Sequence, residues 1–199
     1  MKTAIFKNNA RSYCMTALLG IGSGILIVLL SAVTTADCGM PYISTSTFAA
    51  WFFACALIAL FSETNWLAGV HTALYALCLY LTPCIIDFIS DMRDGFGLDA
   101  FFSNERTWCL ISGLFIAILC YPLAFLLCYG RKQNLFGVLL RFLPAAFMAV
   151  DEASCIRIVF TMHRHVLTTV MEGLCLIAFV AVLLLTMLLE RKRAKLQFA

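Results

Sequence analysis

Three ionisable residues lie inside long apolar stretches of this 199-residue chain, and they are its best candidates for chemistry: His71, Arg141 and Glu172. In a bilayer, a charge among hydrocarbon tails costs about 2.5–3.5 kcal/mol even on insertion scales, so such residues mark functional sites by default. Arg141 and His71 enter their stretches from the same side as Glu63. We therefore predict that Arg141, His71 and Glu63 form a polar cluster at one membrane face, whereas Glu172 lies near the other.

Glu172 is the leading candidate for binding a ligand, together with Asp87 and Asp151. It lies six residues into the last apolar stretch, about 9 Å below the outer boundary at 1.5 Å per residue. Its expected partner is an arginine in an outer loop, a bound cation or an amine; the alternatives are snorkelling and a structural hydrogen bond. Asp87 and Asp151 belong to a set of acidic residues in or beside the outer loops, which either attract a cation or keep those loops in water.

The sequence contains no catalytic or cofactor-binding motif, since GxSxG, HExxH and GxxxxGK[ST] are all missing. His163-Arg164-His165 lies close to Asp151 and Cys155, but it lacks helical ligand spacing, and its arginine would oppose a divalent cation. We therefore predict no catalytic residues, no metal site and no cofactor. An intramembrane enzyme is the least favoured function, because no nucleophile and base converge.

Six apolar stretches must position these residues, and each is near the length that a membrane-spanning helix needs. They cover residues 13–33, 45–61, 66–89, 108–129, 134–150 and 166–189. The chain is 63% hydrophobic with a mean hydropathy of +0.96, which is far outside the range of soluble domains. Continuous apolar runs exclude alternating barrel strands. The prediction is an all-α polytopic membrane protein, a bundle of six transmembrane helices in a single domain over residues 1–199, with the first stretch retained rather than cleaved as a signal peptide.

The distribution of lysine and arginine predicts that both termini are cytoplasmic, because basic residues near helix ends stay on that side. The basic residues on the predicted inner side are Lys2, Lys7, Arg11, Arg131, Lys132, Arg191, Lys192, Arg193 and Lys195. Those on the predicted outer side are Arg93, Arg106, Arg157 and Arg164. The net charge of +3 follows this topology, and we predict no nucleic-acid partner.

The first stretch carries a packing motif of small residues, in which Gly20 and Gly24 form a GxxxG pair and Ala17 lies one turn earlier. Such residues let another helix approach closely where lipid offers no hydrophobic contrast. The partner helix belongs either to this chain or to another one.

A thiol inside an apolar stretch behaves as a small hydrophobic group, as we expect for Cys14, Cys55, Cys78, Cys120, Cys128 and Cys175. The other four, Cys38, Cys84, Cys109 and Cys155, are expected at or near the outer surface, where oxidation is chemically permitted. A bridge between Cys84 and Cys109 would close the loop that they flank, and the sequence leaves this open.

Several short motifs follow one another from the second stretch to the fifth. They are Trp108, Tyr121–Phe125, Cys128–Lys132, Leu139–Leu140, Leu143–Ala146 and Glu152. This pattern resembles a family of small bacterial multi-pass membrane proteins without an assigned activity. The resemblance implies a protein of the bacterial cytoplasmic (inner) membrane and carries no site residues.

The architecture alone is similar to the substrate-binding membrane subunits of energy-coupling-factor vitamin transporters, which have six helices and small residues on the first. That resemblance implies that Ala17, Gly20 and Gly24 dock a membrane partner and that Glu172 faces a ligand. Two functions therefore remain: a ligand-binding or transport component, or a structural, regulatory or immunity-type protein that acts through helix contacts. The expected partners are the lipid bilayer and either a small-molecule ligand or another membrane subunit.

Overall fold

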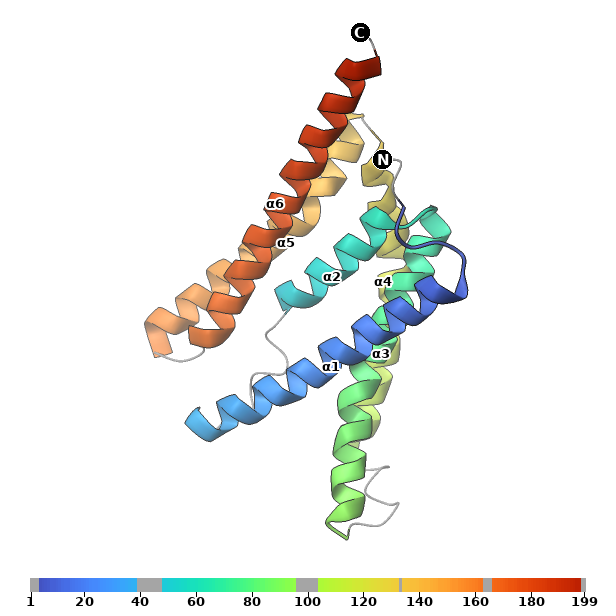
Figure 1. The fold of residues 1–199 in the computed structure, drawn as a ribbon. Coiled ribbons are helices and arrows are strands. Elements are labelled where there is room, and N and C mark those ends of the chain that lie inside the picture. The colour runs from blue at the N-terminus through green and yellow to red at the C-terminus, as the bar shows by residue number, and fades with distance from the viewer. Residues whose placement is uncertain (1–3, 39–47, 96–103, 133, 163–165, 198–199) are drawn as a thin grey trace.

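The computed structural model describes residues 4–38, 48–95, 104–132, 134–162 and 166–197, and within these ranges the chain is helical (Figure 1). The helices are α1 (Ala10–Cys38), α2 (Phe48–Phe61), α3 (Asn65–Arg93), α4 (Asn104–Cys128), the short 3-10 helix η2 (Tyr129–Arg131), α5 (Leu135–Met162) and α6 (Val166–Gln197). The only strand-like pairing in these ranges is a single bridge between Phe6 and Ser62. The all-α prediction is confirmed, with a helix at each of the six predicted places.

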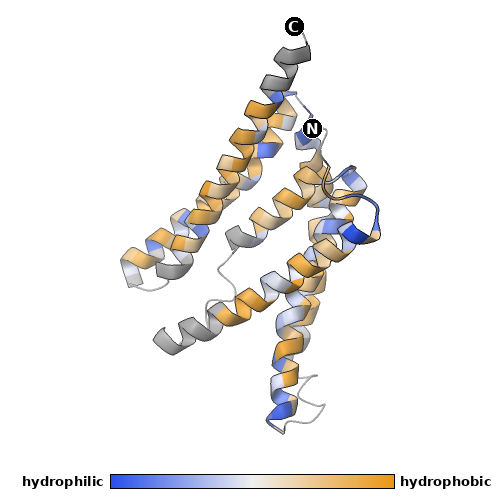
Figure 2. Cartoon of the chain, in the orientation of Figure 1, coloured by the Kyte–Doolittle hydropathy of each residue, from blue (hydrophilic) through white to orange (hydrophobic). Residues whose placement is uncertain are grey.

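Four described segments are long and apolar enough to cross a membrane: Ala10–Leu29, Asn65–Arg93, Leu110–Arg131 and Thr169–Glu190. Apolar residues run along most of their length (Figure 2). Large apolar side chains also cover the outside, as at Leu18 and Leu123, which are 67% and 58% exposed. A surface of this kind is stable against lipid tails and would aggregate in water.

The two remaining helices differ from these four for separate reasons. Helix α2 is only 14 residues long, which is shorter than the hydrocarbon layer requires. Helix α5 is 28 residues long, but Arg141, Asp151 and Glu152 interrupt its apolar sequence.

Helix α3 is the centre of one half of the molecule, with α1 and α4 packed along it. Helices α5 and α6 form an antiparallel pair on the other side, and α2 lies between the two halves, where it contacts α3, α4, α5 and α6 (Figure 1). Thr64 caps the start of α3 by accepting a hydrogen bond from the Leu67 amide at 3.3 Å. Gly95, with a φ of 87°, follows the end of that helix.

The small-residue surface of α1 is covered by α3 of the same chain. A Cβ added to Gly20 would lie 2.6 Å from the carbonyl oxygen of Tyr75, and one added to Gly24 would lie 2.6 Å from Cβ of Thr82. Both distances are too short for real atoms, so the close approach requires glycine at both positions. The open question of the partner helix is therefore answered within the chain, and Gly20 and Gly24 are not a free surface for another subunit.

Helix α5 extends to Met162, well beyond the predicted end at Val150. The expectation that Asp151 and Glu152 lie in or beside an outer loop is therefore wrong, because both are inside this helix. A pair of acidic residues ends an apolar run but does not end a helix, since glutamate is a good helix former. Apolar run length alone placed the boundary too early.

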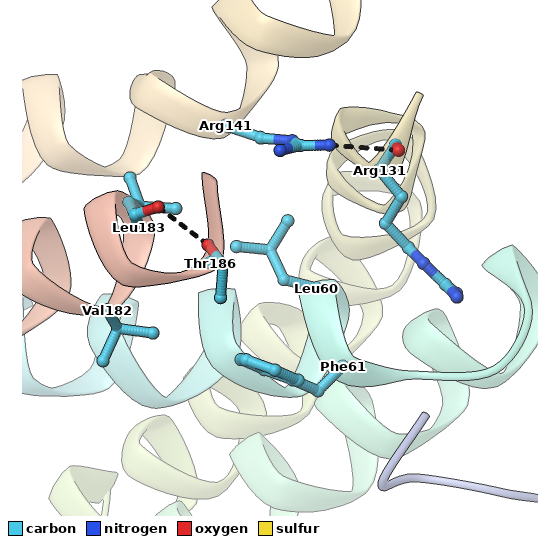
Figure 3. A pocket seen from close by; sticks show the side chains of 7 residues that line it. All are labelled: Leu60, Phe61, Arg131, Arg141, Val182, Leu183 and Thr186. Carbon is cyan, nitrogen blue, oxygen red and sulfur yellow. Dashed lines mark hydrogen bonds between the residues drawn. The ribbon is translucent and has the colours of Figure 1, made fainter. Parts of the chain in front are cut away.

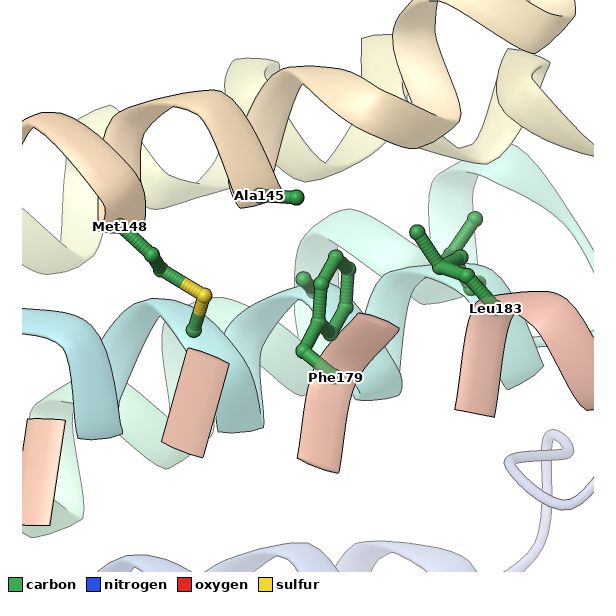
Figure 4. Packing of buried hydrophobic residues seen from close by; sticks show 6 residues of the cluster. Ala145, Met148, Phe179 and Leu183 are labelled. Atoms are coloured by element: carbon green, nitrogen blue, oxygen red, sulfur yellow. The ribbon is translucent and has the colours of Figure 1, made fainter. Parts of the chain in front are cut away.

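Apolar side chains fill the middle of the α5–α6 pair. The core joins Ala145 and Met148 of α5 to Phe179 and Leu183 of α6 (Figure 4). Phe179 is completely buried, and α2 completes the cluster. This apolar layer separates the two polar ends of the helix pair, which are described below.

Candidate functional site

The facing surfaces of α5 and α6 follow a spacing of three and four residues, as in coiled coils. On α5 the series is Arg141, Ala145, Met148, Glu152 and Cys155; on α6 it is Glu172, Leu176, Phe179, Leu183, Thr186 and Glu190. The members in the middle are apolar and those at both ends are polar. The helix pair therefore carries one polar cluster at each end of a shared apolar seam.

Carboxylates gather at the α5–α6 end that holds Glu172. We call Asp151, Glu152, Cys155 and Glu172 the carboxylate cluster. The thiol of Cys155 donates a hydrogen bond to Oε2 of Glu172 at 2.8 Å, and these two residues are 7% and 1% exposed. One ligand atom each from Asp151, Cys155 and Glu172 lies within 4.8 Å of the others.

Local helix geometry explains why these groups meet. Asp151 and Cys155 are four residues apart, so they lie one above the other on the same face of α5. Glu172 approaches from α6. Gly173 lets the Glu152 carboxylate pack closely, because a Cβ added there would lie 3.2 Å from Oε1 of Glu152.

The carboxylate cluster contains buried oxygens without a hydrogen-bond donor. They are Oδ2 of Asp151, Oε2 of Glu152 and Oε1 of Glu172. Among the side chains that the structure describes, no lysine, arginine or histidine forms an ion pair with these three acids. Burying an unpaired carboxylate costs several kcal/mol, so the buried Glu172 beside the half-buried Asp151 and Glu152 favours binding of protons or a cation. The arrangement is suited to holding a positively charged species.

Arg141 anchors the opposite end of the α5–α6 pair. Its Nη1 donates to Oε2 of Glu190 at 2.9 Å, its Nη2 donates to the Arg131 carbonyl at 3.0 Å, and its Nε donates to the Gly130 carbonyl. Figure 3 shows the guanidinium reaching from α5 to Arg131, beside a void of about 10 Å³, room for about one water. Arg141 is only 5% exposed, so it is a structural clamp rather than a snorkelling side chain.

His71 occupies a separate polar pocket on α3 and is fully buried. Its Nδ1 lies 3.0 Å from Oγ1 of Thr16, and its Nε2 lies 3.3 Å from the Lys7 carbonyl. A carbonyl only accepts, so Nε2 carries a proton, and the Thr16 hydroxyl beside Nδ1 also donates to the Ser12 carbonyl at 2.9 Å. The ring also stacks on Tyr13 at 4.5 Å. His71 therefore fastens α1 and the segment before it to α3.

The structure divides the predicted cluster of Arg141, His71 and Glu63. The hydrogen-bond partners of Arg141 belong to η2 and α6, and those of His71 to α1 and the preceding segment. Glu63 lies between the two sites, but it takes part through its backbone: its carbonyl accepts from Arg131 at 3.0 Å, and its amide donates to the Phe6 carbonyl at 2.9 Å. The side chain of Glu63 is exposed.

The predicted ligand-binding residues are also divided. Glu172 and Asp151 come together in the carboxylate cluster, whereas Asp87 is exposed on α3. The far end of α3 lies away from the α5–α6 pair (Figure 1). His163, Arg164 and His165 lie outside the described residues, as do the side chains of Cys38 and Cys109.

Comparison with protein-family models, with characterised proteins and with solved structures finds no match for this chain. The contacts and distances of the carboxylate cluster therefore define the site.

Two members of the polar ends were not predicted from the sequence, Cys155 and Glu190. Cys155 was expected near the outer side of the membrane and was given no partner; it is buried, and its thiol faces Glu172. Glu190 was not considered as a partner of Arg141. The three-and-four spacing along α5 and α6 is the signal that would have identified Cys155 and Glu190. It places them on the facing surfaces of the two helices, together with Glu172 and Arg141.

An apolar cavity of about 390 Å³ opens between α2, α3, α4 and α5. Its walls include Trp51 and Cys55 of α2, Cys120 of α4, and Leu140 and Pro144 of α5. The volume is within the range of small-molecule pockets, and nearly every lining residue is apolar. It is separate from the carboxylate cluster, since no member of that cluster lines it.

Proposed function

We propose that this protein is an integral protein of the bacterial cytoplasmic membrane with six spans and both termini in the cytoplasm. The four apolar segments and the excess of basic residues at one set of helix ends support this arrangement. In it, α2 and α5 complete the bundle, α2 as a short span packed among its neighbours and α5 as a span with an apolar exposed face, as at Leu139 and Val150. The carboxylate cluster then lies near the outer face and Arg141 near the inner face.

We further propose that the protein is a ligand-binding or transport component, and that the carboxylate cluster binds its cationic ligand. The observation that carries this proposal is the buried Glu172 beside the half-buried Asp151 and Glu152, each with one shielded oxygen and none with a described basic partner. A bundle that served only as a scaffold would gain stability from apolar residues at these positions. A bound cation offsets the cost of the buried charges and gives the cluster a function.

The test is ligand-dependent thermal stability of the full chain in lipid nanodiscs. Sodium, potassium, magnesium, manganese and zinc chlorides and the organic amine spermidine are each added to the wild type, to Glu172→Gln and to Asp87→Asn. We expect at least one cation to raise the Tm of the wild type and of Asp87→Asn, because Asp87 is exposed on another helix. The same cation should leave the Tm of Glu172→Gln unchanged. The proposal fails if no cation stabilises the wild type or if Glu172→Gln responds equally.

A second candidate function is the binding of an apolar molecule, and the apolar cavity favours it. Native mass spectrometry of protein released from its own membrane separates the two candidates. A retained apolar small molecule or specific lipid supports the cavity, whereas a retained cation supports the carboxylate cluster. The alternative of a protein that docks partners through Ala17, Gly20 and Gly24 is weakened, because α3 already covers Gly20 and Gly24.

A further inference from the structure

We propose that Asp151, Cys155 and Glu172 form a binding site for a divalent transition-metal ion of the zinc class. This inference rests on the proposed function, because it names the chemical class of the cation that the carboxylate cluster takes. It also departs from the sequence-based prediction of no metal site, which considered Asp151 and Cys155 only as neighbours of His163–His165 and did not include Glu172.

The positions of the donor atoms support a metal of this size. The three ligand atoms lie within 4.8 Å of one another, and Sγ of Cys155 is 2.8 Å from Oε2 of Glu172. Tetrahedral zinc, with bonds of about 2.0–2.3 Å, needs donors about 3.3–3.8 Å apart. Side-chain movements of about 1 Å therefore suffice. Two donors come from one face of α5 and the third from α6, so binding would join the two helices.

Unsatisfied oxygens point to a missing positive ligand. Glu172 is 1% exposed, and its Oε1 has no hydrogen-bond partner among the described residues. Oδ2 of Asp151 is also buried without a donor. A hydrogen bond within the cluster satisfies only the other oxygen of Glu172. Native proteins rarely leave several buried carboxylate oxygens unpaired in one place, and a site for a cation explains such oxygens.

The mixture of donors selects the class of metal. Magnesium and calcium take oxygen ligands in sets of six or more, and a thiolate is a poor ligand for them. Zinc accepts cysteine and carboxylates together in a set of four. Three protein ligands leave the fourth position to a water or to Glu152, whose Oε2 is also buried and unpartnered. A divalent ion would cancel two of the three negative charges of its ligands.

Binding must release a proton, because the thiolate rather than the thiol is the ligand. The proton that Sγ of Cys155 donates to Glu172 in the described state would leave to solvent as the S–metal bond forms. The affinity is therefore expected to fall as the pH is lowered, since protons compete for all three ligands.

The experiment measures metal content and affinity of the full chain in nanodiscs after treatment with a chelator. Zinc is added, and its stoichiometry and Kd are determined by elemental analysis and by competition with a chromophoric chelator. Cobalt(II) is then used as a spectroscopic probe of the thiolate. We expect one tight zinc per chain, a Kd at least tenfold weaker in Asp151→Asn, Glu172→Gln and Cys155→Ser, and loss of the thiolate-to-cobalt charge-transfer band in Cys155→Ser.

Cys14→Ser is the matched control, because Cys14 is an exposed cysteine on α1 and should keep both the affinity and the band. Each variant is first melted in the presence of chelator, so that loss of binding is not confused with loss of folding. Asp151→Asn changes the least buried of the three ligands and keeps the test decisive if Cys155→Ser does not fold.

The possible failures are distinguishable. If zinc does not bind, or binds Cys155→Ser and the wild type equally, the metal assignment is overturned. If another cation still raises the Tm only when Glu172 is intact, the proposed cation site stands without this metal. If no cation has any effect, both proposals fail together.

Discussion

Replacing Arg141 is the most direct test of how the α5–α6 pair is held together at the end that carries Arg141 and Glu190. The guanidinium makes three hydrogen bonds, to Glu190 and to the carbonyls of Gly130 and Arg131. The side chains of Arg141 and Glu190 are 6% and 16% exposed. Arg141→Met keeps the apolar stem of the side chain. It leaves the Glu190 carboxylate without its ion-pair partner and the carbonyls of Gly130 and Arg131 without their donor.

The expected cost lies between two limits. Hydrogen bonds in membrane proteins average about 0.6 kcal/mol in double-mutant cycles, so three of them set a lower limit of about 2 kcal/mol. Removing one partner of a buried ion pair costs about 3–5 kcal/mol, which sets the upper limit. We therefore expect Arg141→Met to destabilise the protein by about 2–5 kcal/mol. In the double variant with Glu190→Met no unpaired charge is left, so the cost should be less than the sum of the single variants, with a coupling of about 0.5–3 kcal/mol.

The assay is unfolding in nanodiscs or mild detergent, followed by tryptophan fluorescence, with Arg157→Met as the control. Arg157 is on the same helix and exposed, so its replacement should stay within about 0.5 kcal/mol. An Arg141→Met variant as stable as Arg157→Met would refute the reasoning. It would mean that Arg141 reaches the headgroups instead of clamping α5 to α6 and η2.

Two further predictions concern other helix contacts. Gly24→Ala should destabilise the protein by about 1–3 kcal/mol, because the added methyl group would lie 2.6 Å from Cβ of Thr82. Gly22→Ala, with nothing within 4 Å of the added group, should be neutral or stabilising by up to about 1 kcal/mol. Equal melting temperatures of these two variants would exclude the close α1–α3 contact. Leu140→Trp should fill part of the apolar cavity and weaken binding of a fluorescent fatty acid. Leu139→Trp, at an exposed position of the same helix, should leave that binding unchanged. Identical binding by the two variants would exclude the cavity as the binding site.

The positions and type of the helices were predictable because helical hydrogen bonds are local and lipid exposure demands long apolar runs. The predicted stretches at 66–89 and 108–129 lie close to the observed α3 and α4. The end of α5 was not predictable in the same way. Asp151 and Glu152 end the apolar run in the sequence. Their side chains lie beside α6, and this contact, which the sequence does not show, explains why polar residues are found inside the helix at this point.

The candidate site was predicted in part. Glu172, Arg141 and His71 were recognised because an ionisable residue among apolar neighbours is conspicuous in the sequence, and all three are buried. Their partners were not recognised. Glu172 was expected to meet an outer arginine or a cation, and its described hydrogen bond comes from the thiol of Cys155.

The sequence by itself determined that this chain is helical and apolar and that a few ionisable groups must be buried in it. Composition and run length are properties of each segment alone, so no knowledge of the neighbours is needed. The tertiary structure alone decided which segments meet: α3 against Gly20 and Gly24, Glu190 against Arg141, and Cys155 against Glu172. Lipid gives no hydrophobic contrast between helix faces, so these choices depend on close packing and polar contacts between residues far apart in the chain.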